Sequence, residues 1–122
     1  MGHSLKELAE TGAPLLLRRA AELLEDRGWQ KGITYNPSTG AFDVEGALCF
    51  TAGAKASAMI DGGAIESLVP NAKSAAVWVA WETLSWAVGR DPIAWQDSPG
   101  RTATEVIEAL RSAAERLEIA VA

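Results

Sequence analysis

The order of apolar and polar residues predicts two strongly amphipathic helices. Between Pro14 and Gly28, leucine and alanine recur at helical spacing, and the charged residues lie mostly off that stripe. Pro14 suits the first turn of a helix, and Gly28 suits its end. The second helix follows Thr102, which has the spacing of a capping box with Glu105. Its apolar stripe runs through residues 103–117, so each helix should bury one face.

A third helix is predicted over residues 72–88, where apolar residues cover almost the whole circumference. It carries three of the chain's five tryptophans, Trp78, Trp81 and Trp86. A helix that is apolar all round is normally buried. We therefore expect it at the centre of the domain, or as the shared surface of a homodimer. It is too short to span a membrane, and Lys73 and Glu82 interrupt it.

The remaining segments are less regular. A capping-box spacing near the N-terminus predicts a short helix from Leu5. Residues 32–45 alternate around turn residues and predict an irregular or hairpin insert. In the small-residue segment 47–60, Gly53 would cost a helix about 1 kcal/mol relative to Ala, so we expect a neighbouring helix to approach closely there. The fold class is therefore all-α: one domain over residues 1–122, a compact bundle of about four main helices with short extra turns.

Composition narrows the classes of function. The chain has 122 residues, 48% of them apolar and 22% charged, which is typical of one folded domain. A net charge of −5 without a basic patch argues against nucleic-acid binding. A lone cysteine, Cys49, allows no intramolecular disulfide and indicates a cytosolic location. The polar N-terminus does not resemble a signal peptide. We expect no membrane and no nucleic acid among the partners.

Few residues suggest catalysis, and none suggests a cofactor. The only histidine, His3, and the only cysteine, Cys49, lie in unrelated contexts, so no nucleophile is paired with a base. No Cys/His pair has metal-ligand spacing, and no glycine motif fits a phosphate. Cys49 stands among small apolar residues, which predicts an inert buried thiol. An enzyme would have to use Glu82 or Asp97 as its acid or base.

The stretch IAWQDSPGRTATEVIEAL, residues 93–110, poses the main question of site or structure. Its Ser-Pro-Gly sequence supplies turn chemistry, which leaves Trp95, Asp97 and Arg101 to be explained. In one interpretation, Trp95 closes the end of the core while Asp97 accepts from turn amides or pairs with Arg101. In the other, these three residues line a pocket that faces a ligand or partner, since tryptophan and arginine are enriched at binding hot spots.

Three motifs together resemble a family of small actinobacterial and actinobacteriophage proteins of uncharacterised function. They are Gly28-Trp29 at a helix end, Cys49 before Gly53-Ala54, and Trp95-Gln96-Asp97 before Gly100-Arg101-Thr102. Gln96 departs from the asparagine usual in that family, which weakens any exacting chemical role for this amide. The resemblance implies a helical fold and an origin connected with phages, and it implies no activity.

Two functions follow from this sequence. The first is a non-enzymatic accessory protein of phage or prophage origin that acts by binding a bacterial host protein. The second is a small-molecule binder or sensor, with nucleotides as one candidate ligand and a pocket near Trp95 and Arg101. A homodimer through helix 72–88 is compatible with either function. The expected binding residues are Trp95, Asp97, Arg101, Trp78 and Trp81.

Overall fold

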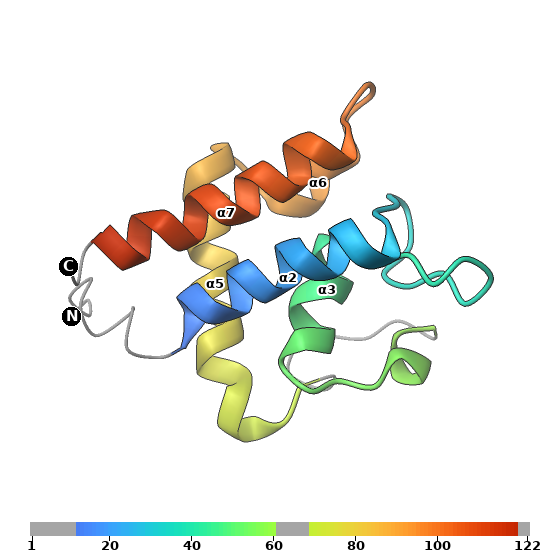
Figure 1. Cartoon of the computed structure of the whole chain (residues 1–122), viewed down its shortest axis with the longest axis horizontal. Helices are drawn as coiled ribbons and strands as arrows, with labels where there is room; N and C mark the ends of the chain where they lie inside the picture. Colours follow the sequence, from blue (N-terminus) through green and yellow to red (C-terminus); the bar gives the residue numbers. More distant parts are fainter. Residues whose placement is uncertain (1–11, 61–68, 120–122) are drawn as a thin grey trace.

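The protein is described by a computed structural model (Figure 1), which covers residues 12–60 and 69–119. Within these residues the fold is helical and contains no strand, as predicted. The helix expected from Leu5 lies outside the described residues. In chain order, the elements are α2 (Ala13–Arg27), α3 (Val44–Thr51), the 3₁₀ turn η1 (Ala56–Met59), α5 (Asn71–Val88), α6 (Pro92–Gln96) and α7 (Ala103–Ile119).

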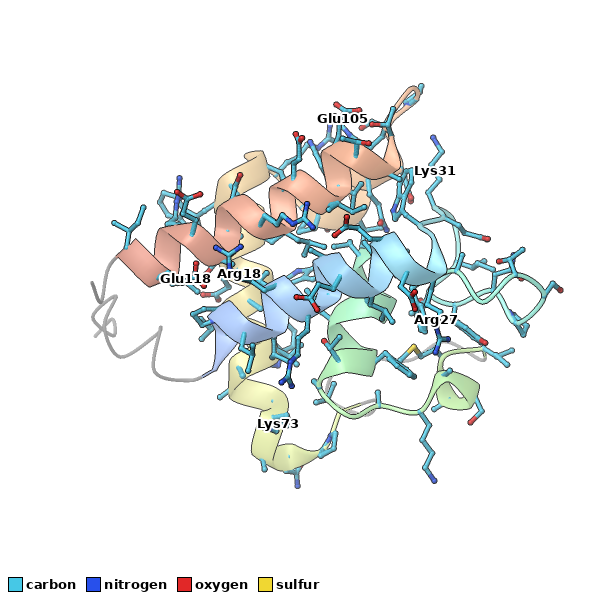
Figure 2. All side chains as sticks on the ribbon, viewed as in Figure 1. Arg18, Arg27, Lys31, Lys73, Glu105 and Glu118 are labelled. Carbon is cyan, nitrogen blue, oxygen red and sulfur yellow. The ribbon has the colours of Figure 1, made fainter. Side chains whose placement is uncertain are left out.

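Helices α2 and α7 lie side by side and form the largest packed surface of the fold (Figure 1). Their predicted apolar stripes face inward: Leu16 and Leu24 of α2 and Leu110 and Leu117 of α7 are buried. Leu17 of α2, outside the predicted stripe, is fully buried as well. At the rim, the Arg18 guanidinium pairs with the Glu118 carboxylate (Figure 2). Arg111 of α7 likewise pairs with Glu25 of α2. Because these charged groups remain partly exposed, the ion pairs add little stability compared with the buried leucines.

Helix α5 crosses both α2 and α7 and also contacts α3 and α6 (Figure 1). Its position is central, as predicted, but its tryptophans do not make the core. Its buried residues are mainly small or aliphatic, whereas Trp78 is 39% exposed and Trp86 is 77% exposed. Small side chains allow helix axes to approach, so they occupy the crossing and the large rings lie outside it. The buried residues are Ala76, Val77, Ala80, Thr83 and Leu84.

The predicted insert is an ordered loop that lacks hairpin strands. Phe42 is fully buried and makes two isolated β-bridges, a parallel one with Trp29 and an antiparallel one with Tyr35. Its ring also lies 4.8 Å from the Tyr35 ring and 5.1 Å from the Phe50 ring, measured between centroids. The loop is therefore held by the side chain of Phe42. It ends earlier than expected, because α3 begins at Val44.

The glycine that permits a close approach is Gly46, and the expectation for Gly53 was wrong. Gly53 lies beyond the end of α3 with φ of 109°, so it does not weaken a helix interior. At Gly46, by contrast, an added Cβ would lie 2.1 Å from the backbone carbonyl oxygen of Thr34. Only glycine fits there without a shift of the backbone. Helix α3 and the loop can therefore pack directly against each other.

Candidate functional site

Arg101 joins the end of α6 to the start of α7. Its guanidinium carbon lies 4.1 Å from the centroid of the Trp95 ring, within cation–π distance. Its Nε donates to the backbone carbonyl of Trp95 at 3.1 Å, and its Nη1 donates to Glu105 Oε2 at 2.9 Å. The sequence-predicted residues Trp95 and Arg101 are thus brought together. Asp97 is the C-cap of α6 and is exposed, and Arg101 pairs with Glu105 in its place.

The capping box predicted at the start of α7 is formed. The backbone N–H of Thr102 donates to Glu105 Oε1 at 3.0 Å, and the backbone N–H of Glu105 donates to Thr102 Oγ1 at 3.3 Å. The hydrogen bonds from Thr102, helped by Arg101, lower the pKa of the Glu105 carboxyl. Lys31 Nζ also donates to the carbonyl of Ser98, which ties the loop after α2 to this turn (Figure 2). The side chains of Arg101, Thr102 and Glu105 therefore have structural partners within the chain.

A shallow, open hollow of about 500 Å³ lies between α2 and α3, away from this turn. Its sides are formed partly by the apolar side chains of Leu23 and Phe50, and charged side chains of α2 surround them. Neither Trp95 nor Arg101 lines it, so this hollow is not the pocket expected at that turn. Its lining residues are Arg19, Glu22, Leu23, Asp26, Phe50 and Thr51.

Gln96 is the centre of a buried polar network that was not expected from the sequence. Its side chain is fully buried. Its Oε1 accepts from the Trp29 indole N–H at 3.1 Å and from the backbone N–H of Val44 at 2.9 Å, and its Nε2 donates to Asp43 Oδ2 at 3.1 Å. Gln96 therefore connects α6 to the loop after α2 and to the start of α3. The amide of Gln96 therefore has a structural role, which the sequence did not predict.

Asp43 is the second member of this network and the N-cap of α3. Its Oδ1 accepts from the backbone N–H of Gly46 at 2.7 Å. Burial raises the pKa of the Asp43 carboxyl to about 6, although the hydrogen bonds from Gly46 and Gln96 oppose that rise and the negative charge of Asp97 adds to it. Glu45, two residues further along, also has a raised pKa through burial and the charge of Asp43. Among the carboxyl groups of the described residues, Asp43 therefore has the most strongly shifted pKa.

One signal in the sequence could have located Asp43, and none could have located Gln96. An acidic residue directly before an apolar run is a recognised start of a helix, and Asp43 precedes Val44 in that way. Gln96, in contrast, stands between a tryptophan and an aspartate in a stretch typical of a turn. Its burial depends on Trp29 and Asp43, which are 67 and 53 residues away along the chain.

The groups considered for catalysis are poorly placed for it. Cys49 is fully buried, and burial raises the pKa of its thiol to about 12, so the nucleophilic thiolate is scarce near neutral pH. Glu82 is exposed on α5, outside the hollow between α2 and α3. In the part of the chain that the structure describes, no three acidic, histidine or cysteine side chains gather to hold a metal ion. No helix there is both long and apolar enough to cross a bilayer.

The remaining candidate is a solvent-facing stripe of α5, which we call the tryptophan face: Trp78, Glu82 and Trp86. These residues stand four apart, so each lies about one turn from the next on one side of the helix. All three are exposed, and Trp86 is the most exposed large apolar residue described. Trp81, also predicted as a binding residue, is half-buried and packs against the core.

Comparisons with known proteins place the chain in a family but supply no activity. No curated protein and no solved structure matches it. A family model does match, over residues 9–116, and it is described as a family of unknown function. This agrees with the resemblance to an uncharacterised family drawn from the Gly-Trp, Cys and Trp-Gln-Asp motifs. The chain therefore belongs to the family of unknown function DUF6197.

Proposed function

We propose that this protein is a non-enzymatic binding module that engages a bacterial host protein through the tryptophan face of α5. The observation that carries the proposal is the exposure of Trp86, 77%, beside the 39% exposed Trp78 on the same side of the helix. Gathered apolar surface is characteristic of interaction sites, and tryptophan is the residue most enriched at the energetic centres of interfaces.

The placement of the other candidate groups supports binding of a protein over the alternative functions. For a small ligand at Trp95 and Arg101, the ligand would have to displace the hydrogen bonds that Arg101 makes to Trp95 and Glu105. For catalysis, Glu82 or Asp97 would have to act as acid or base, and both are exposed and lie outside the hollow between α2 and α3. The tryptophan face needs no such rearrangement, because its rings already lie at the surface. For this reason, binding of a host protein is favoured over small-molecule binding and catalysis.

The proposal also covers the origin of the gene and the compartment in which the protein acts. The resemblance to actinobacterial and actinobacteriophage proteins supports a phage or prophage accessory gene, with the host cytosol as the place of action. A homodimer through residues 72–88 would use the same face, so a host protein and a second copy would compete for it.

The test is affinity capture of the full-length protein from nuclease-treated actinobacterial lysate. The parent is compared with a Trp78→Ala, Trp86→Ala variant, and with a Leu15→Ala, Ile33→Ala control that removes exposed apolar side chains elsewhere. We expect one host protein to be enriched by the parent and by the control, and to be lost with the tryptophan variant.

A third variant, Trp95→Ala with Arg101→Ala, distinguishes the two surfaces. Loss of the captured protein with this variant, but not with the tryptophan variant, would move the contact to the turn before α7. Enrichment of no host protein by the parent would overturn the proposed function.

A further inference from the structure

The tryptophan face carries a negative charge at its centre. Glu82 stands one turn after Trp78 and one turn before Trp86, and α5 contains only one other charged residue, Lys73 near its start. Among the described residues, Glu82 has no ion-pair partner within the fold, and its side chain is exposed. In the free protein, water solvates this carboxylate.

A partner that covers both indole rings must also cover Glu82, which lies between them. Burial of a carboxylate without a compensating charge costs several kcal/mol, so an entirely apolar partner surface would bind poorly. A cation placed over Glu82 removes that cost, and it also meets the faces of the neighbouring indoles, which attract positive charge. The chemistry of the face therefore selects a basic side chain surrounded by apolar ones.

The same chain already holds a cation in this kind of environment. At the turn before α7, Arg101 lies against the Trp95 ring while its Nη1 donates to the Glu105 carboxylate. That cluster joins the Trp95 indole of α6, the Arg101 guanidinium and the Glu105 carboxylate in the first turn of α7. The tryptophan face presents the indoles and the carboxylate and lacks the guanidinium.

A second copy of the chain is a poor source of a positive charge for Glu82. In a two-fold antiparallel pairing centred on the tryptophan face, Trp78 would meet Trp86 of the other copy, and Glu82, at the axis, would lie against Glu82. Each copy also carries a net charge of −5, which adds repulsion at long range.

We propose that the tryptophan face binds an apolar helical segment of a partner protein that places an arginine over Glu82, between Trp78 and Trp86. Arginine fits better than lysine because its planar guanidinium can bind a carboxylate with two donors while stacking on an indole. This inference rests on the proposed function and names the chemistry of the partner.

The test uses three synthetic helical peptides of about 18 residues, because much shorter helices are marginal in water. They share leucines four residues before and after a central position, which is arginine, glutamine or glutamate. Each is titrated into the full chain while the indole N–H signals of the tryptophans are followed by NMR. We expect the arginine peptide to bind roughly tenfold more tightly than the glutamine peptide, as a cation–π contact together with an ion pair would give, and the glutamate peptide to bind most weakly.

Two protein variants make the result specific to Glu82. Glu82→Gln removes the ion pair and leaves the cation–π contact, so it should weaken the preference for the arginine peptide over the glutamine peptide. The matched control, Glu108→Gln on the exposed side of α7, should retain it. Both positions are exposed, so both variants should fold, which circular dichroism would verify.

Equal affinity for the arginine and glutamine peptides would overturn the inference. So would a preference of undiminished size in Glu82→Gln, or no binding of the arginine peptide at millimolar concentration. A dimer in sedimentation that is lost with Trp86→Ala would identify a second copy as the occupant instead. If the captured host protein depends on Trp78 and Trp86 but binds Glu82→Gln unchanged, the proposed function stands and this inference fails.

Discussion

Helices α7 and α5 both pack into the core, but α7 buries leucines whereas α5 buries mainly small side chains. In α7, leucines such as Leu110 and Leu117 are buried and the charged residues face solvent. In α5, which is apolar almost all round, Ala76 and Ala80 are buried while Trp86 is exposed. Periodicity identifies the buried face only where polar residues mark the other face. In α5 nothing in the pattern marks it, and two of the largest apolar residues, Trp78 and Trp86, lie on the outside while Trp81 is half-buried.

The crossing of α5 over α2 and α7 gives the physical reason. Helix axes pack about 8–10 Å apart, and the distance depends on the side chains at the contact. Alanines at the crossing keep the distance short, whereas an indole there would force the helices apart. The apolar area of α5 that this packing leaves exposed is the tryptophan face. Packing α5 against α2 and α7 through its small residues therefore also leaves a surface suited to a partner.

The largest effect on stability is expected from Leu110→Ala in α7. Leu110 is fully buried, so the substitution removes buried apolar area and leaves a cavity. It should lower the free energy of unfolding by about 2–5 kcal/mol, as measured by urea denaturation. Glu108→Ala, on the exposed side of the same helix, is the control. A loss no larger than that of the control would mean that α7 does not pack through this face.

An intermediate effect is expected from Ala80→Leu in α5. This change adds volume at a fully buried position of the crossing and should lower the free energy of unfolding by about 1–3 kcal/mol. Ala87→Leu adds the same volume at an exposed position of the same helix and should have little effect. Equal stabilities of the two variants would contradict the orientation of α5.

The smallest effect is expected from Trp86→Ala, although it removes the largest side chain of the three. Because Trp86 is mostly exposed, the free energy of unfolding should change by less than about 0.5 kcal/mol. Binding of the partner should nevertheless be lost. A destabilisation comparable to that of Leu110→Ala would show that Trp86 belongs to a core, and would remove the basis of the tryptophan face.

More of the fold than of the candidate site could be predicted from the sequence. The capping box at Thr102 and the end of α2 at Gly28 were predicted correctly, because caps depend on residues a few positions apart. The role of Gln96 was missed, because the three groups it binds come from Trp29, Asp43 and Val44. The binding roles of Trp95, Asp97, Arg101, Trp78 and Trp81 stay predictions.

The sequence by itself determined the helical class, the buried faces of α2 and α7, and the turn before α7. Each depends on local spacing, because a helix repeats every 3.6 residues and a cap is formed within one turn. Only the tertiary structure decided which side of α5 is buried, which glycine permits a close approach, and where the buried amide of Gln96 finds its partners. These depend on the distance between elements far apart in the sequence, and that distance is fixed only when the core packs.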